Sequence, residues 1–233
     1  MNLTTFLQLI YRNLLLLLAG GLLAATAAWW FVSQQKQEFT SEALLSTGII
    51  SSVSIKNADG GKSADRDYAQ NELENLVSLA NAHKTREELA TRLLATYLQM
   101  PQPDVRLISE AEYNELHTAV FKPEVKALRD STLEGTLARI IRQRDAATPN
   151  EVQKLIFSEK GYFGIDQYAK NLKVYRKGTS DLLQFTYTTT DAAICRHTLA
   201  VLLDIFMDKH ATLKKGQSSE VSAYFAEATT QST

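Results

Sequence analysis

An apolar stretch at residues 14–32, LLLLLAGGLLAATAAWWFV, constrains this chain more than any other feature. Residues 13–35 carry no charged side chain, and a helix needs about 20 predominantly apolar residues to cross the hydrocarbon core of a bilayer. Trp29 and Trp30 lie at one end of the stretch and Tyr11 precedes the other, and such rings favour the headgroup layer. The sequence therefore predicts a transmembrane helix at 14–32, with Tyr11, Trp29 and Trp30 as membrane-interface anchors.

Two other interpretations of this stretch stay open. A secretory signal also contains an apolar run, and Ala25-Thr26-Ala27 is similar to a signal cleavage site. Against cleavage, the first eleven residues contain no Lys or Arg, and the apolar character continues past that site. A buried core helix would have to be apolar on every side, which a domain of this size seldom accommodates. We therefore expect a retained span.

The residues around the stretch predict its orientation and its neighbours. Arg12 precedes it, whereas a basic and an acidic residue follow it and offset each other, so the leader at 1–13 is predicted to be cytoplasmic. The protein would then lie in the inner membrane, with its bulk in the periplasm. Gly20, Ala24 and Ala28 recur every four residues. Because small residues let helices approach closely in a bilayer, this stripe predicts transmembrane packing.

The rest of the chain is long enough for one substantial domain with its own core. It carries 24 of the 25 basic residues and all 26 acidic ones, a net charge of −2, so no basic surface recruits nucleic acid. The single cysteine, Cys195, has no partner for an internal disulfide. We expect a periplasmic base domain at 33–216 and the start of a further helix at 217–233.

Local patterns predict an α+β fold, with a small mixed or antiparallel sheet packed by several helices. A β-rich segment at 39–55, interrupted near Gly48, reads as one long strand or a strand pair. Helix-start patterns then recur along the middle of the chain. They are Thr85 with Glu88, Ser109 with Glu112, Ser131 with Glu134, and Thr148-Pro149 with Glu151. Pro101 and Pro103 are expected to end the helix that Thr85 opens.

The C-terminal third combines a hairpin with a long helix. Residues 172–176 and 182–188 alternate apolar and polar side chains, and the five residues between them suit a hairpin better than a parallel crossover. Asp191 opens an amphipathic helix near the positive end of its dipole. Gly216 is expected to stop that helix.

Candidate chemical sites are few, and none supports an enzyme. Gly61-Lys62-Ser63 is similar to the end of a phosphate-binding loop, but Lys56 stands where the first glycine of that motif belongs. The four histidines lack the close spacing of zinc ligands, and Cys195 is expected to be a buried small hydrophobe. The remaining candidate is a basic cluster, Arg139, Arg142 and Arg144, which offers a possible contact to an anion or a glycan. No catalytic, cofactor-binding or metal-binding residue is predicted, and no cofactor.

A family resemblance enters with the C-terminal third. The order Lys173-Val174-Tyr175-Arg176, then the segment 180–187 (SDLLQFTY), then Thr190-Asp191 at a helix start resembles the chain-length determinants. These proteins, also called Wzz-like polysaccharide co-polymerases, act in bacterial surface-glycan assembly. The segment Phe39-Thr40-Ser41-Glu42-Ala43-Leu44-Leu45 and the helix expected at 71–81 are similar to the family's first strand and the segment after it.

This resemblance implies the function. Members of the family are noncatalytic inner-membrane proteins whose periplasmic bases form rings, and the rings set the length of the polymer that a partner polymerase makes. The expected partners are therefore further copies of the chain, the membrane, a polysaccharide polymerase and lipid-linked glycan. The polymer would be lipopolysaccharide O-antigen, capsule or exopolysaccharide. The main alternative is an extracytoplasmic sensor or ligand-binding domain of a truncated membrane receptor, and an enzyme is the third hypothesis.

Overall fold

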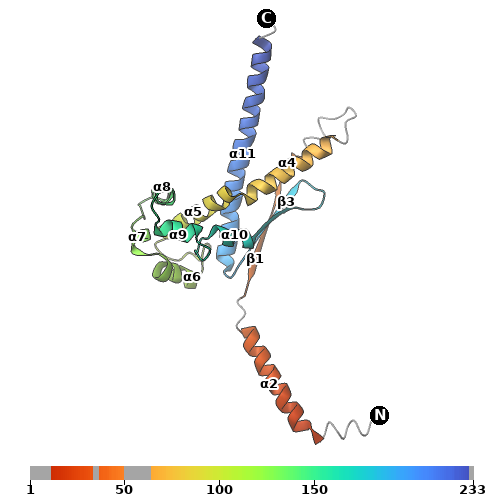
Figure 1. The fold of residues 1–233 in the computed structure, drawn as a ribbon, viewed down its shortest axis with the longest axis vertical. Coiled ribbons are helices and arrows are strands. Elements are labelled where there is room, and N and C mark those ends of the chain that lie inside the picture. Colours follow the sequence, from red (N-terminus) through yellow and green to blue (C-terminus); the bar gives the residue numbers. More distant parts are fainter. Residues whose placement is uncertain (1–11, 34–36, 50–63, 231–233) are drawn as a thin grey trace, which may run out of the picture. The chain divides into compact units, whose positions relative to one another are not determined.

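The computed structural model describes residues 12–33, 37–49 and 64–230 of the 233-residue chain. These residues belong to two compact units. The first unit, Met1–Glu38, contains helix α2 (Leu14–Ser33), and the second, Phe39–Thr233, contains the other described helices and strands (Figure 1). The loop expected around Gly61-Lys62-Ser63 lies outside the described residues, as does Tyr11.

Helix α2 forms where the apolar stretch predicts a helix, but the predicted transmembrane span and the inner-membrane localisation are wrong. Among the residues that the structure describes, no helix is both long enough and apolar enough to cross a membrane. A crossing needs about 20 predominantly apolar residues in succession. The 20 residues of α2 include Gly20, Gly21, Thr26 and Ser33, which lower its apolar character.

The second unit is α+β and is built on a three-stranded antiparallel sheet, as the alternating patterns predict. The strands β1 (Phe39–Ser46), β2 (Leu172–Arg176) and β3 (Leu182–Thr189) lie in the order β1-β3-β2. The predicted hairpin pairs Leu172 with Tyr187 through Arg176 with Leu183, and Gly178 takes a φ of 61° in its turn. The first strand pairs with β3 over its whole length, from Phe39–Thr189 to Ser46–Leu182.

One face of this sheet carries the core. Three helices pack on the strands: α4 (Ala64–Asn81), α10 (Ile165–Asn171) and the long α11 (Ala192–Thr230). The β3 side chains on that face, Leu183, Phe185 and Tyr187, are buried. The opposite face leaves Leu44 and Tyr175 largely exposed, at 53% and 46%. One face of the sheet is therefore buried in the core, whereas the other is exposed along β1 and β2, with Gln184 of the central strand buried between Leu44 and Tyr175.

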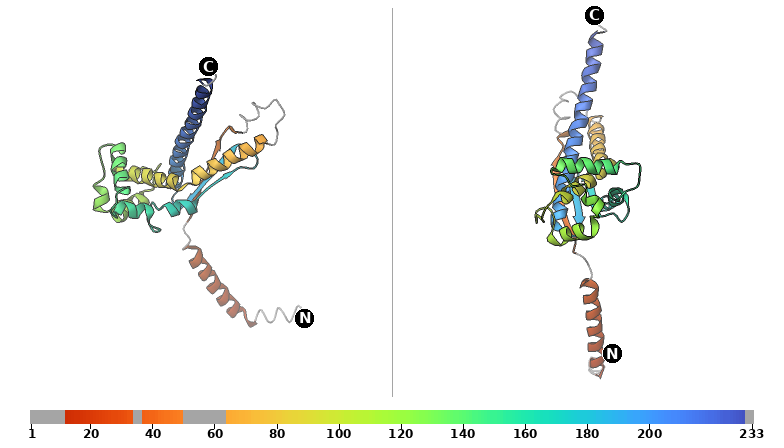
Figure 2. Two further views of the ribbon diagram at one scale, coloured as in Figure 1. Left: turned by 45° about the horizontal axis from the view of Figure 1, so that its top comes forward. Right: turned by 90° about the vertical axis from the view of Figure 1, so that its left-hand side faces the viewer.

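A group of helices connects β1 to the hairpin and packs beside the sheet (Figures 1 and 2). Helix α5 lies at its centre and contacts α4, α8, α9, α10 and α11. Its members are α5 (His83–Gln99), α6 (Glu110–Glu115), the π-helical turn η1 (Leu116–Val120), α7 (Pro123–Lys126), α8 (Leu133–Arg144) and α9 (Glu151–Phe157). Their buried side chains extend the core of the sheet without a break.

Several helix starts differ from the sequence prediction by one to three residues. Ser109 caps α6 as expected and accepts a hydrogen bond from the Glu112 amide. Helix α5, however, begins at His83, and the Thr85 hydroxyl donates instead to the Leu79 carbonyl at 2.7 Å. The caps of α8 and α9 are Thr132 and Asn150, each one residue or more from the expected position. At α8 and α9 a neighbouring polar side chain caps the helix in place of the expected one, whereas at α5 the cap residue is Ala82 and no side chain caps the helix.

Helix α11 is longer than predicted because it continues through Gly216 to Thr230. Glycine in a helix interior costs only about 1 kcal/mol relative to alanine, so it ends a helix only where the chain also turns. The residues expected to form a separate helix after Gly216 are therefore part of α11. Its C-terminal half extends away from the rest of the second unit (Figure 1).

Candidate functional site

The candidate site is a charged groove between helices α5, α8 and α11. Its volume is about 610 Å³, within the range of small-molecule sites. The α5 residues follow a helical spacing of three and four, which places them on one face. The lining residues are Lys84, Glu87, Glu88, Thr91 and Arg92 from α5, Leu137, Ile141, Arg144 and Asp145 from α8 and its end, and Lys209 from α11.

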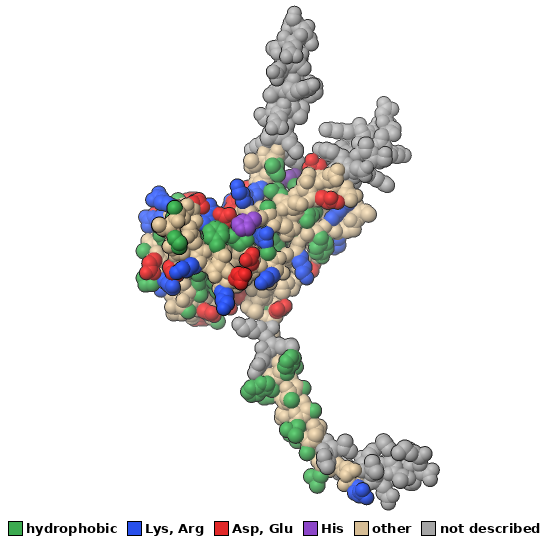
Figure 3. All heavy atoms as spheres, in the orientation of Figure 1, with side chains coloured by type: hydrophobic (Ala, Val, Ile, Leu, Met, Phe, Trp, Pro, Cys, Tyr) green, Lys and Arg blue, Asp and Glu red, His purple; other side chains and the backbone are tan. Residues whose placement is uncertain are grey.

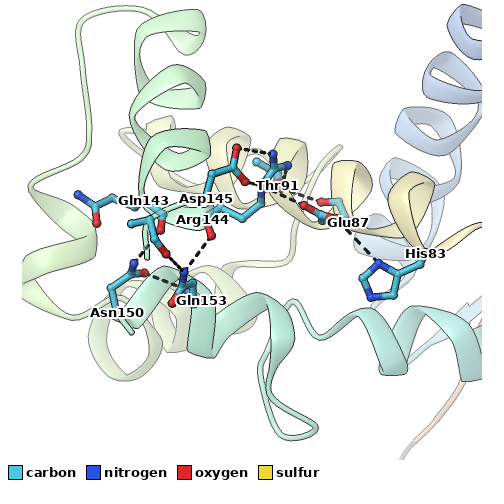
Figure 4. A network of polar contacts seen from close by, with 9 residues as sticks. His83, Glu87, Thr91, Gln143, Arg144, Asp145, Asn150 and Gln153 are labelled. Atoms are coloured by element: carbon cyan, nitrogen blue, oxygen red, sulfur yellow. Dashed lines mark hydrogen bonds and ion pairs between the residues drawn. The ribbon is translucent and has the colours of Figure 1, made fainter. Parts of the chain in front are cut away.

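Arg144 is the centre of one half of the groove (Figure 4). Its guanidinium lies 2.8 Å and 3.1 Å from the two carboxylate oxygens of Asp145, and its Nε lies 3.1 Å from Glu87 Oε1. A further guanidinium nitrogen donates to the Thr91 hydroxyl at 3.4 Å. The hydrogen bond to Asp145 is the main cause of a raised pKa for Arg144. This side chain, only 17% exposed, joins α8 to α5.

The amide side chains of Gln153 in α9 and of its cap residue, Asn150, hold the end of α8 in place (Figure 4). The Gln153 amide donates to the carbonyls of Arg144 and Ala146, at 3.0 Å and 2.7 Å. Asn150 donates to the Gln143 carbonyl at 2.7 Å. The last carbonyls of a helix have no partner within the helix, so these amides satisfy them and fix the backbone from which Arg144 extends.

Glu88 is the centre of the other half of the groove. One carboxylate oxygen accepts from Arg92 at 2.7 Å, and the other lies 2.8 Å from Lys209 Nζ. Burial alone would raise the pKa of Glu88, but the hydrogen bonds and charges of Lys209 and Arg92 outweigh it, and the pKa is lowered. Asp208 lies 3.7 Å from Arg92. These ion pairs join α5 to α11.

The groove has the chemistry of a binding surface with almost no net charge. Its lining contains four cations and three carboxylates, and all except Lys84 form an ion pair within the network. Leu137 and Ile141 add an apolar floor. Because the charges already neutralise one another, the groove does not select for an anion by electrostatic attraction. Its demonstrable role in the fold is to hold three helices together.

The structure separates the three arginines that the sequence groups as a possible anion or glycan contact. Arg144 enters the groove, whereas Arg139 forms an ion pair with Asp130 at 3.0 Å and donates to the Arg129 carbonyl. Arg142 is exposed, and no ion pair with another described residue is formed. The arginines therefore do not form one site. The groove's charges on α5 were not predicted as a site, although Lys84, Glu88 and Arg92 follow one another at intervals of four residues and so share a helix face.

Five of the residues that the sequence singles out in the apolar stretch lie on α2. Gly20, Ala24 and Ala28 are exposed on α2, and open space surrounds the position that a Cβ atom on Gly20 would take. Trp29 and Trp30 are 73% and 66% exposed. In the space-filling view, apolar side chains extend along the described part of this helix (Figure 3).

Two histidines contact the buried side chain or backbone of Tyr97. The Nδ1 atom of His197 lies 3.0 Å from the Tyr97 hydroxyl, and the Nε2 atom of His117 lies 3.1 Å from the Tyr97 carbonyl oxygen. The described residues contain no group of acidic, histidine and cysteine side chains able to hold a metal ion. Cys195 is buried, and its thiol donates to the carbonyls of Tyr187 and Phe39. It is enclosed in the core, as the sequence predicts.

Comparison of the chain with models of protein families, with curated proteins and with solved structures finds no match.

The arginines of α8 provide a matched pair of variants. Arg144→Ala is expected to lower the free energy of unfolding by about 2 kcal/mol, because Glu87 and Thr91 lose a charged partner in a partly buried position. Arg142→Ala, on the same helix but exposed, is expected to change it by less than about 0.5 kcal/mol. Urea denaturation of both variants measures this difference. Equal effects would contradict a structural role for Arg144.

The two histidines predict a loss of stability in mild acid. Burial is the main cause of a lowered pKa for both, assisted by Lys126 and Arg129 for His117 and by Arg196 for His197; the Tyr97 carbonyl and Asp104 oppose it. The folded state therefore binds fewer protons than the unfolded chain, and stability should fall as the pH drops below the unfolded value of about 6.5.

The measurement is the urea midpoint between pH 7.5 and 5.5. The decline should be smaller in His117→Gln and in His197→Asn, whose neutral amides replace the titrating rings. The control variant is His83→Gln, at an exposed position on α5 whose Nδ1 atom lies 3.9 Å from Glu87 Oε2. A decline of the same size in all three variants would show that other groups cause it.

Proposed function

We propose that this protein is a noncatalytic, self-associating scaffold that regulates the chain length of a bacterial surface polysaccharide. A polysaccharide polymerase and its lipid-linked glycan are the proposed partners. The observation that carries the proposal is the combination of the β2–β3 hairpin with the long helix α11. The β2–β3 hairpin is followed, after Asp191, by the 39-residue helix α11. The hairpin, α11 and β1, which is the third strand of the same sheet, all belong to the second unit.

This arrangement supports the proposal because it matches the order of segments on which the resemblance to chain-length determinants rests. The basic strand β2, the aromatic-rich strand β3 and the aspartate at the helix start are adjacent parts of one fold. The first strand, far away in sequence, pairs with β3. A compact base with a projecting helix is a shape suited to assembly with further copies.

Two measurements test this function together. Deletion of the gene should change the length distribution of the surface polysaccharide, seen as a changed ladder of bands on a gel. The purified full chain should be larger than a monomer in light scattering. A strictly monomeric protein whose deletion leaves the polysaccharide lengths unchanged would refute the proposal.

A ligand-sensing domain is the second candidate, and the charged groove is the observation that bears on it. A sensor needs polar groups that converge on a ligand, whereas the groove's charged side chains pair with one another. The groove therefore supports a sensor function less than the β2–β3 hairpin and helix α11 support a scaffold function.

A further inference from the structure

The outer edge of strand β1 offers a row of backbone hydrogen-bonding groups. In an antiparallel pair, the amide and carbonyl of one residue point to the partner strand, and those of the next residue point away. The Thr47 amide donates to the Asp181 carbonyl, so odd-numbered residues of β1 face β3. The even-numbered residues, Thr40, Glu42, Leu44 and Ser46, therefore direct their amides and carbonyls outward. Within the described part of the chain, no strand pairs with this edge.

This edge lacks the features that usually prevent edge-to-edge pairing. Natural edge strands are kept apart by lysines, prolines, bulges or short length. Strand β1 has eight residues, and its register with β3 is continuous and so contains no bulge. Glu42 is its only charged residue, and its carboxylate accepts from Gln184 at 3.0 Å. The opposite edge, β2, has five residues, of which Lys173 and Arg176 are basic.

The sequence of β1 also fits a second copy of itself. Opposed residues in adjacent strands have side chains on the same face of the sheet. If a two-fold axis relates two copies of β1, opposed residues must therefore both be odd-numbered or both even-numbered, and the axis passes beside one residue of each copy and not between two residues. A centre at Glu42 would place two carboxylates opposite each other, which is unfavourable. A centre at Ala43 pairs Glu42 with Leu44 and Thr40 with Ser46, and it overlaps the strands from 40 to 46. A centre at Leu44 shortens that overlap.

We propose that two copies of this chain pair antiparallel through the outer edges of β1, with the two-fold axis at Ala43. The two sheets then form one continuous sheet across the axis. The outward pairs, Thr40 with Ser46 and Glu42 with Leu44, each exchange two backbone hydrogen bonds. Leu44, 53% exposed in the single chain, gains a cross-strand neighbour. This two-fold contact closes at two copies and therefore differs from the head-to-tail contact that a ring requires. It rests on the proposed scaffold function only for its biological role.

The expected association is weak. One strand edge buries less than the roughly 1,200 Å² that a stable interface requires, so dimerisation through β1 alone should depend on protein concentration in the micromolar range or above. Further contacts between copies would strengthen it. Sedimentation over a range of concentrations measures this association directly.

Disulfide trapping tests the register. The Ala43 side chains of the two copies would be a directly opposed pair, with Cβ atoms about 5 Å apart, so Ala43→Cys should form a covalent dimer under mild oxidation with oxidised glutathione. Ser41→Cys is the matched control, because it lies on the same face but about 13 Å from its own copy, four residues along the strand. Wild type controls for Cys195, which is buried. Equal cross-linking of the two variants, or none with Ala43→Cys, would overturn the proposal.

Proline at position 44 tests the edge itself. The Leu44 amide points outward, so Leu44→Pro removes a donor from the proposed interface and none from the β1–β3 ladder. It should weaken association at least tenfold, whereas Leu44→Thr, which keeps the amide, should not. Circular dichroism checks that each variant is folded. If Leu44→Pro does not fold, the cysteine pair decides the question.

The outcomes separate this inference from the proposed function. A folded Leu44→Pro protein that associates as wild type does would overturn pairing through β1 and leave the scaffold function intact. A Leu44→Pro protein that no longer associates, expressed in place of wild type with unchanged polysaccharide lengths, would establish the interface and refute the scaffold function.

Discussion

Replacing Gly161 with alanine is expected to lower the free energy of unfolding by about 3 kcal/mol. A Cβ atom at this buried position would collide with the Leu155 carbonyl oxygen and lie 2.7 Å from the Lys154 carbonyl oxygen. Both are backbone atoms at the end of α9 and cannot rotate away. The Leu155 carbonyl also accepts a hydrogen bond from the Phe163 amide at 3.1 Å, so moving it would disturb a buried core residue.

Thermal unfolding measures this effect, and Gly178→Ala provides the comparison. For a unit of this size, about 3 kcal/mol corresponds to a fall in Tm of roughly 6–12 °C. Gly178 has open space around its Cβ position but a φ of 61°, so its replacement should cost only about 1 kcal/mol in backbone strain. Equal losses for the two variants would show that α9 relaxes around the new methyl group.

Asp191→Ala should be comparably destabilising, by about 3 kcal/mol. One carboxylate oxygen of Asp191 accepts from the amides of Ala193 and Ile194 at the start of α11, at 2.7 Å and 2.9 Å. The other accepts from the Ser109 amide at 3.0 Å. This aspartate therefore caps α11 and attaches it to the start of α6. Its loss leaves three backbone donors without an acceptor, and urea denaturation measures the cost.

The pH dependence of this loss identifies its cause. Burial would raise the pKa of Asp191, but the hydrogen bonds from Ser109, Ile194 and Ala193 outweigh it, and the pKa is lowered. The ionised group thus stabilises the fold above its unfolded pKa of about 3.9, and this contribution is lost as the pH falls through the folded value. The gap between wild type and Asp191→Ala should therefore narrow below pH 4. A constant gap would mean that the carboxylate charge has no part in the cap.

Short-range patterns predicted most elements of the second unit correctly. The β2–β3 hairpin and the Ser109 cap depend on residues a few positions apart, so the sequence carries that information locally. Helix starts were less accurate, as at Thr85, because its hydroxyl donates to the Leu79 carbonyl of the preceding helix and α5 begins at His83 without a side-chain cap. Gly216 was misread because a glycine can lie inside a helix at small cost.

The basic cluster shows where local reading fails. Arg139 and Arg142 are three residues apart and share a side of α8, whereas Arg144 is two residues beyond Arg142 and points elsewhere. That periodicity was available in the sequence. The partner of Arg144 on α5, Glu87, was not, because it is separated by a long stretch of chain and meets Arg144 only when α5 packs against α8.

The sequence by itself determined the helix predicted at 14–32, the α+β composition, the hairpin and the helix start at Asp191, because each follows from periodicity or from neighbours along the chain. The tertiary structure alone decided that β1 pairs with β3 and leaves an open edge, that Glu88 joins α5 to α11, and that Gly161 admits no side chain. Each of these depends on residues brought together from distant parts of the chain. Such contacts form only through packing of the whole unit, and no local pattern encodes them.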